Sequence, residues 1–129
     1  MLIEVAAAII RQKGCYLIAK RKRDALLGNL WEFPGGKRKM DESLDDCLRR
    51  ELKEEMGVEV IIHNLVHEVL YPYSHSVVIV YFYNCSIRSG EIRPLACQEF
   101  RWVPPRELLM YSFPPANNPL IGELICSQS

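Results

Sequence analysis

Three glutamates stand within five consecutive residues of this chain, between a glycine-containing loop and a glycine that can end a helix. They are Glu51, Glu54 and Glu55, in the segment GKRKMDESLDDCLRRELKEEMGV of residues 36–58. Like charges about one helical turn apart repel each other, and the repulsion grows when the side chains are partly removed from water. Any fold that contains this segment must therefore bring positive charge to the glutamates, and we expect a divalent cation.

The same segment predicts one α-helix. Ser43, followed by Asp46 three residues later, forms a capping pair for its N-terminus, and Asp41 is a second candidate for the cap. Gly57 can adopt the left-handed conformation that ends a helix. At about 100° per residue, one face is apolar and the opposite face is charged. These faces consist of Leu44, Leu48 and Leu52 and of Asp45, Asp46, Arg49 and Lys53, respectively.

The three glutamates do not belong to the solvated face of this helix. Glu51 and Glu55 fall beside the apolar stripe and Glu54 borders it, so we expect the carboxylates to point toward the body of the protein or into a cleft. Ordinary solvated charges remain one interpretation, because glutamate favours helices and charge runs usually lie at the surface. The inward face favours the other interpretation, in which carboxylates bind magnesium or manganese and one acts as a general base toward a metal-bound water.

The segment resembles a complete Nudix box, whose pattern is G-x5-E-x7-R-E-U-x-E-E-x-G-U, where U is aliphatic. Every specified position is filled, by Gly36, Glu42, Arg50, Glu51, Leu52, Glu54, Glu55, Gly57 and Val58. A motif of this length is far more specific than a lone glycine-rich loop. The resemblance implies hydrolysis of nucleoside diphosphates linked to another group, with Mg²⁺ or Mn²⁺ held by the box glutamates. It also implies an α/β fold, an α/β/α sandwich with a mixed, curved sheet, as the interleaved helix and strand patterns do independently.

The resemblance implies roles for the individual residues of the box. The expected metal ligands are the backbone carbonyl of Gly35 and the carboxylates of Glu51, Glu54 and Glu55. Glu51 and Glu54 are also expected to be catalytic, with Glu51 either a metal ligand or the general base. Arg50 is the third expected catalytic residue, because it would orient a box glutamate.

Two further positions bear on this assignment: the acidic residue Glu42 and Ala96, where an acidic residue is missing. Glu42 is expected to hold the loop against the helix rather than to take part in the chemistry. MutT-like Nudix enzymes usually carry another glutamate two residues before a glutamine, and here Ala96 stands at that position before Gln98. Glu99 lies close by, but a shift along a strand changes the direction of the side chain. The missing acid is expected to affect the rate, or the binding of an additional metal, more than the type of reaction.

The resemblance to the MutT-like branch extends beyond the box. Residues 31–37, WEFPGGK, resemble the segment that leads into the box in that branch, and residues 113–119, FPPANNP, resemble a segment characteristic of it. In that branch the asparagine that matches Asn117 hydrogen-bonds the purine edge. Asn118 and Pro119 would suit an N-cap and a first helical residue, which leaves Asn117 free to face a pocket. The alternative is that Asn117 is only a turn residue.

Several side chains are expected to contact a nucleotide substrate. They are Asn117, Arg21, Lys37, Phe33 and Tyr73. Arg21 belongs to the basic cluster of residues 20–23, which could either meet a triphosphate or form a solvated turn. Tyr73, Tyr81 and Phe82 could stack on a base, although aromatic residues of strands more often belong to the core.

The main hypothesis is a Mg²⁺-dependent nucleoside triphosphate pyrophosphohydrolase that acts on an oxidised purine such as 8-oxo-dGTP and thereby cleans the nucleotide pool. Its expected products are the monophosphate and pyrophosphate. One alternative is a Nudix enzyme that prefers CTP or modified dCTP, whose relatives tend to place an acid where Asn117 stands. The other is a catalytically silent nucleotide-binding module. Such modules usually lose box glutamates, and all of them are present here, so Ala96 is the one feature that favours this alternative.

Composition argues against several other classes of protein. We expect one domain over residues 1–129. Sixteen basic and sixteen acidic residues balance each other, which argues against binding to nucleic acid polymers. Five cysteines without a CxxC pair favour reduced thiols in the cytoplasm, with Cys47 a candidate for oxidation or alkylation. The apolar residues 5–10 are too few to span a membrane and have no basic leader. We expect a monomer, and structural or surface roles for His63 and His67.

Hydrophobic patterns predict the remaining elements. Strands are expected over residues 2–10, 15–19, 58–70 (with a polar interruption near His63 and Asn64), 76–85 and 100–103. Gly14 is expected to form the hairpin between the first two strands, and residues 24–30 a mobile loop beside the substrate. Helices are expected to begin at Pro104–Pro105 and at Pro119. The last helix should bury Leu120, Ile121, Leu124 and Ile125.

Overall fold

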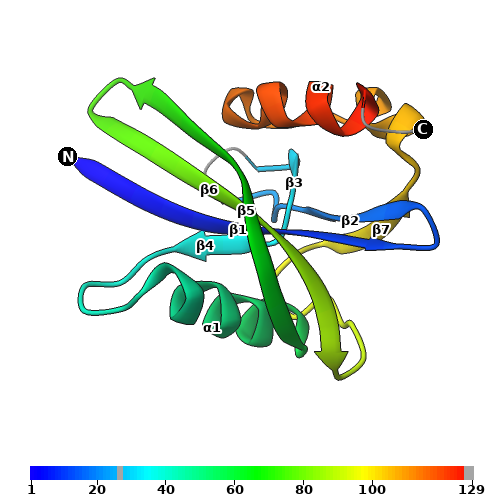
Figure 1. Cartoon of the computed structure of the whole chain (residues 1–129). Helices are drawn as coiled ribbons and strands as arrows, with labels where there is room; N and C mark the ends of the chain where they lie inside the picture. The colour runs from blue at the N-terminus through cyan, green and yellow to red at the C-terminus, as the bar shows by residue number, and fades with distance from the viewer. Residues whose placement is uncertain (26–27, 127–129) are drawn as a thin grey trace.

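The computed structural model describes residues 1–25 and 28–126. A mixed sheet lies between two α-helices, with α1 (Leu44–Met56) on one side and α2 (Asn118–Cys126) on the other (Figure 1). Two 3₁₀-helices, η1 (Pro105–Met110) and η2 (Pro115–Asn117), lead into α2. This arrangement confirms the predicted α/β/α sandwich.

The sheet combines parallel and antiparallel pairs. Among the described residues its strands are β1 (Leu2–Gln12), β2 (Cys15–Lys20), β3 (Trp31–Glu32), β4 (Gly35–Lys37), β5 (Glu59–Tyr73), β6 (Ser76–Ser89) and β7 (Glu99–Val103). Their order is β3-β2-β1-β6-β5, with β4 paired to β1 and β7 paired to β2. The β1–β6 pair is parallel and the other pairs are antiparallel. The strand expected at residues 76–85 is β6, which is central as predicted.

β1 separates the two halves of the hydrophobic core. Successive side chains of a strand point to opposite faces, so Ala7 and Ile9 pack in the layer under α2, whereas Ala8 and Ile10 pack in the layer under α1. Because both faces are covered, the strand is apolar without alternation, as its sequence suggested. The hairpin that follows turns at Gly14, which has a φ of +79°.

Helix α1 has the ends that its sequence predicts. Ser43 Oγ accepts a hydrogen bond from the backbone N–H of Asp46 over 3.1 Å, so Ser43 is the N-cap and Asp41 is not. Gly57 has a φ of +71°, and its N–H donates to the Lys53 carbonyl. Leu48 and Leu52 are fully buried under the sheet.

Two element boundaries differ from the prediction. β5 runs without a break through the polar residues 63 and 64, because the chain absorbs them in a shift of register between Ile62 and Leu65. The N-cap expected at Asn118 is wrong: this residue already has helical angles of φ −56° and ψ −44°. Its N–H donates to the Pro115 carbonyl, so η2 passes into α2 without the extended residue that a cap requires.

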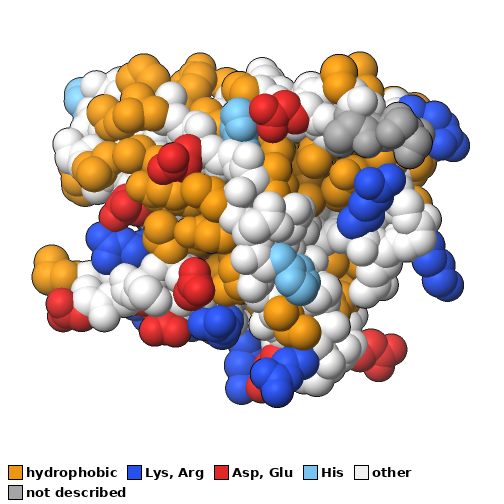
Figure 2. Space-filling view, viewed as in Figure 1, with side chains coloured by type: hydrophobic (Ala, Val, Ile, Leu, Met, Phe, Trp, Pro, Cys, Tyr) orange, Lys and Arg blue, Asp and Glu red, His pale blue; other side chains and the backbone are white. Residues whose placement is uncertain are grey.

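On the face of the molecule seen in Figure 2, hydrophobic and charged side chains gather in different regions. In Figure 2 hydrophobic side chains predominate around the β5–β6 hairpin, and charged side chains gather at the lower edge around α1. Leu65 and Leu70 of β5 are among the exposed hydrophobic residues. No helix of the described residues is long and apolar enough to cross a membrane. The loop predicted at residues 24–30 includes residues 26–27, which lie outside the described residues.

Candidate active site

Two glycines allow β4 to approach its neighbours closely. A Cβ atom added to Gly35 would collide with the backbone of Ala6 and Ala7 in β1, and one added to Gly36 would collide with the carboxylate of Glu51. Pairing of β4 with β1 therefore places the glycine backbone directly beside a box glutamate. Any side chain at these two positions would push the strand, or the glutamate, away.

Arg50 connects the loop before α1 to the box glutamates. Its Nε and Nη2 donate to the two carboxylate oxygens of Glu42 over 2.7 and 2.8 Å, a bidentate pair. Nη1 lies 3.2 Å from Glu54 Oε2 and 3.5 Å from Glu51 Oε2. The Arg50 guanidinium lowers the pKa of Glu42 to about 2. Glu42 also accepts a hydrogen bond from the Lys39 N–H, so it holds the loop against the helix, as the sequence suggested.

Glu51 and Glu55 each have one carboxylate oxygen that is buried and accepts no hydrogen bond from the described part of the chain. In both side chains Oε2 has no hydrogen-bond partner among the described residues. Burial and the charges of Glu32 and Glu51 raise the pKa of Glu55 to about 9, and burial raises the pKa of Glu51. Buried acceptors without donors are unfavourable, so these oxygens fit a divalent cation in both charge and ligand type.

Glu51 and Glu55 line a cavity of about 300 Å³, called here the carboxylate pocket. Its lining residues are Arg21, Lys22, Ala25, Glu32, Gly35, Glu51, Glu55 and Ala96. Of the four predicted metal ligands it brings together Gly35, Glu51 and Glu55. Glu54 does not line it: its side chain is 56% exposed and pairs with Arg50. Within the described ranges, the side chains as they stand form no cluster of three His, Cys, Asp or Glu that could hold an ion.

Glu32 lines the carboxylate pocket but was not singled out from the sequence. Its Oε1 accepts a hydrogen bond from Arg21 Nη1 over 2.8 Å, and burial raises its pKa. The segment that leads into the box carried a signal, since β3 buries Trp31 on one face and must turn the next side chain to the other. The structure also places Arg21 and Lys22, from the basic cluster, at this pocket.

A second cavity, of about 130 Å³, adjoins the carboxylate pocket through Arg21 and Glu32. This aromatic pocket is lined by Val5, Ala7, Arg21, Glu32, Phe33, Tyr73, Val78, Val80, Pro114, Ala116 and Asn117. Asn117 is buried, with 8% of its surface exposed, and its Nδ2 donates to the Pro114 carbonyl over 3.4 Å. The ring of Phe33 stacks on Phe113 with centroids 5.5 Å apart. Asn117 is therefore part of a pocket wall rather than an exposed turn.

Lys37 lies apart from the carboxylates. It lines a third, more open cavity of about 390 Å³, the outer pocket, with Ile3, Val5, Arg21, Tyr73, Ser74, His75, Ser76 and Val78. Tyr73 and Arg21 border both the aromatic and the outer pocket. All five predicted substrate-binding residues thus line the aromatic or the outer pocket.

The other side chains considered for base stacking or metal binding make contacts within the protein instead. Phe82 is fully buried in the core, and the Tyr81 hydroxyl donates to Glu4 Oε2 over 3.0 Å. Glu99 accepts a hydrogen bond from Arg101 over 2.8 Å and does not line the carboxylate pocket, so it does not replace the acid absent at Ala96.

The expectation that Cys47 is open to oxidation or alkylation is wrong. This residue is fully buried under β4, where its Sγ donates to the Gly36 carbonyl over 3.5 Å. Burial raises the pKa of the thiol to about 11, and a protonated thiol is a poor nucleophile. His63 and His67 contact Ser86 and Glu123, respectively, in agreement with structural or surface roles.

Comparison with known proteins identifies the family. Residues 5–123 match the model of the NUDIX domain. The chain is 35% identical to the CTP pyrophosphohydrolase of Escherichia coli (strain K12) over 120 residues, which cover 93% of this chain and 89% of the relative. It is 32% identical to the 8-oxo-dGTP diphosphatase of the same organism over 123 residues, 95% of either chain. The solution structure of the E. coli ORF135 protein has a TM-score of 0.85 and 32% identity, and the match covers 99% of this chain and 91% of that one.

This chain belongs to the Nudix family and is a Nudix hydrolase. The family resemblance that the sequence suggested is confirmed, including its MutT-like character. Nudix hydrolases generally need a divalent metal and act on small nucleotide substrates.

Proposed function

We propose that this protein is a Mg²⁺-dependent nucleoside triphosphate pyrophosphohydrolase. Its preferred substrate would be an oxidised purine nucleotide such as 8-oxo-dGTP, cleaved to the monophosphate and pyrophosphate. The observation that carries the proposal is that Glu51 and Glu55 each bury a carboxylate oxygen without a hydrogen-bond partner among the residues described, close to a pocket that Asn117 lines. The relative named 8-oxo-dGTP diphosphatase, which matches over nearly its whole length, supports the choice of substrate.

The carboxylate pocket would hold the metal through the Gly35 carbonyl, Glu51 and Glu55, with Glu54 at its edge. A divalent cation bound there would offset phosphate charge and lower the pKa of a bound water. Glu51 lies against the glycine backbone and would act as ligand or general base. Arg50 would orient Glu51 and Glu54, which it contacts at 3.5 and 3.2 Å.

Asn117 would read the base. Its Nδ2 uses one hydrogen for Pro114, which leaves Oδ1 as an acceptor and one N–H as a donor. Oxidised guanine carries a hydrogen on N7, where the normal base has only an acceptor. A buried acceptor such as Asn117 Oδ1 would therefore favour the oxidised base, because the normal base would leave both acceptors unpaired. Phe33 and Tyr73 would contact the ring, and Arg21 and Lys37 the phosphates.

A nucleotide panel tests the proposal. Pyrophosphate release would be measured with Mg²⁺ and with a chelator for 8-oxo-dGTP, dGTP, CTP, dCTP and 5-methyl-dCTP. We expect the highest kcat/KM for 8-oxo-dGTP and no turnover with the chelator. Absence of metal-dependent pyrophosphate release from every nucleotide would refute the proposal. Tight nucleotide binding without turnover would instead favour a silent binding module.

CTP or modified dCTP is the second candidate for the substrate. The observation in its favour is that the CTP pyrophosphohydrolase relative is 35% identical, at least as similar as the diphosphatase at 32%. Asn117→Asp separates the two candidates, because a carboxylate accepts from the cytosine amino group and repels the guanine O6. We expect this variant to lose activity on 8-oxo-dGTP relative to CTP by about tenfold or more. A wild-type preference for CTP would make this the better account.

We also propose that the protein is a monomer in the cytoplasm. All five cysteines lie in the described residues and are free thiols, which fits a reducing compartment. Analytical ultracentrifugation would test the oligomeric state, and a sedimenting dimer would contradict it.

A further inference from the structure

Gln98 forms hydrogen bonds with both ends of the loop that joins β2 to β3. Its backbone N–H donates to the carbonyl of Lys20, the last residue of β2, over 2.9 Å. Its side-chain Nε2 donates to the Arg21 carbonyl over 2.7 Å and to Asn29 Oδ1 over 2.6 Å. Asn29 stands two residues before the start of β3 at Trp31. These hydrogen bonds therefore join the two ends of the loop, residues 20–21 and 29–30, called here the neck, to the segment before β7.

The amide of glutamine fits both side-chain contacts, whereas glutamate and asparagine do not. Both acceptors are oxygens, and the NH₂ group has two hydrogens, one for each. A glutamate at neutral pH has no hydrogen to donate and would repel both oxygens. An asparagine is one methylene shorter, so the same group would not reach.

Asn29, in the neck of the loop, has an unfavourable backbone conformation that its neighbours must stabilise. Asn29 has a φ of +67°, a left-handed conformation that asparagine adopts more readily than most residues but at some cost. Its N–H donates to the Arg21 carbonyl over 3.2 Å, and the Arg21 N–H donates to the Leu30 carbonyl over 2.9 Å. Gln98 binds the side chain of Asn29 and the carbonyl of Arg21, and therefore stabilises this geometry from outside the loop.

Arg21 is the residue that the neck holds in place. It lines the carboxylate pocket, the aromatic pocket and the outer pocket, and it pairs with the partly buried Glu32 over 2.8 Å. A displacement of its backbone would move a positive charge relative to all three cavities at once.

We propose that Gln98 is a positioning residue, which holds the Arg21 backbone so that the guanidinium meets the phosphates of the nucleotide. The nature of the ligand rests on the proposed function. Gln98 lines none of these three cavities, so it acts through Arg21 rather than by touching the substrate.

Steady-state kinetics test this role. Gln98→Ala should raise KM by about tenfold, the equivalent of one or two net hydrogen bonds, and leave kcat within about twofold. Gln98→Glu should raise KM at least as much. Asn84→Ala is the matched control, because it removes another exposed amide hydrogen bond, of 3.3 Å to Asn64 on β5, and should leave KM unchanged. A Gln98→Ala variant with unchanged KM, or with only a lower kcat, would overturn the inference.

Hydrogen exchange gives a second readout that does not depend on turnover. In Gln98→Ala the amides of Arg21 and Asn29 should exchange about tenfold faster, while those of α1 keep their rates. If the wild type hydrolyses nucleotides but neither exchange nor KM changes, the inference about Gln98 is wrong and the proposed function stands. If exchange accelerates but the wild type hydrolyses no nucleotide, the proposed function fails, and the substrate role of Gln98 fails with it.

Discussion

Glu55 is the side chain whose surroundings suit an isolated charge least. Its Oε2 is buried without a partner, and the charges of Glu32 and Glu51 add to the burial that raises its pKa to about 9. A group in this position destabilises the metal-free protein when it is ionised. A bound cation would remove this penalty, so the charge state of Glu55 should depend on metal binding.

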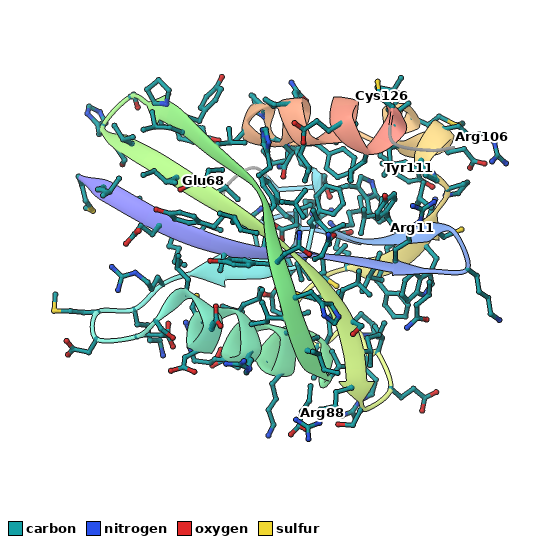
Figure 3. The ribbon with its side chains drawn as sticks, viewed as in Figure 1. Arg11, Glu68, Arg88, Arg106, Tyr111 and Cys126 are labelled. Carbon is teal, nitrogen blue, oxygen red and sulfur yellow. The ribbon has the colours of Figure 1, made fainter. Side chains whose placement is uncertain are left out.

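Glu55→Gln should therefore affect the melting temperature and the enzymatic activity in different ways. The buried Glu55 must either hold a proton that the unfolded chain releases or carry a charge, and glutamine needs neither. We therefore expect the metal-free variant to melt at the same or a higher temperature above pH 7. Its activity should fall by about 100-fold or more, and its melting temperature should no longer rise with Mg²⁺. Glu68→Gln, on the outer surface of β5 (Figure 3), is the control and should behave as the wild type. Wild-type activity in Glu55→Gln would contradict the metal assignment.

The pair of Glu42 and Arg50 predicts a loss of stability in acid. Arg50 lowers the pKa of Glu42 to about 2 from the usual 4.5, so the folded protein binds this proton less readily than the unfolded chain. The resulting stability is fully present above about pH 4.5 and is lost as the pH falls toward 2. Thermal melts between pH 2 and 6 should show a shallower slope for Glu42→Gln than for the wild type. Parallel slopes would show that the pair does not contribute.

Sequence patterns predicted some of the residues at the candidate site and missed others, for physical reasons. Glu51 and Glu55 could be found because helical periodicity alone places them on the inward face of α1. Glu32 and Gln98 could not, because their contacts with Arg21 exist only after β2, β3 and β7 come together. Glu99 pairs with Arg101, which stands two residues further on the same strand, so the alternation of β7 already places both side chains on one face.

At the scale of elements, prediction succeeded where signals are local. α1 was predicted at both ends, since Ser43 and Gly57 act within one turn of their own positions. The start of α2 was predicted wrongly, because the preceding 3₁₀ turn from Pro115 already places Asn118 in a helical conformation. In β5 the polar residues near His63 suggested an interruption, whereas pairing with β6 continues across them.

Because β4 approaches α1 closely, a methyl group added at Gly36 should displace a box carboxylate and reduce activity. In Gly36→Ala the new Cβ would occupy the space of the Glu51 carboxylate, so the carboxylate must move. We expect activity to fall by about 100-fold and Mg²⁺ affinity to weaken, as measured by pyrophosphate release and calorimetry. Gly122→Ala in α2 is the matched control, because its Cβ would meet nothing within 4 Å. The control should keep full activity and gain up to about 1 kcal/mol of stability.

At the scale of the whole molecule, metal binding should change how stability depends on pH. The folded-state pKa of Glu55, about 9, lies above the usual 4.5, so the folded protein without metal holds a proton that the unfolded chain releases. Its stability is greatest below about pH 4.5 with respect to this group and falls progressively up to about pH 9. Melting temperatures with a chelator should therefore decline from pH 5 to 9, and the increase caused by Mg²⁺ should grow over the same range. A metal-induced increase that is the same at every pH would contradict this.

The fold class followed from the sequence, but the order of strands did not. Interleaved patterns predicted a sheet covered by helices, whereas the parallel β1–β6 pair joins segments far apart in the chain and leaves no local signal. The single domain expected over residues 1–129 stays a prediction.

The most direct test of metal binding is a calorimetric titration of Mg²⁺ into the purified protein, with and without a non-hydrolysable nucleotide. We expect heat of binding for the wild type that disappears in Glu55→Gln and remains in Glu68→Gln. No detectable binding of Mg²⁺ or Mn²⁺ to the wild type, with nucleotide present or absent, would contradict the claim that the buried carboxylates of α1 hold the catalytic metal.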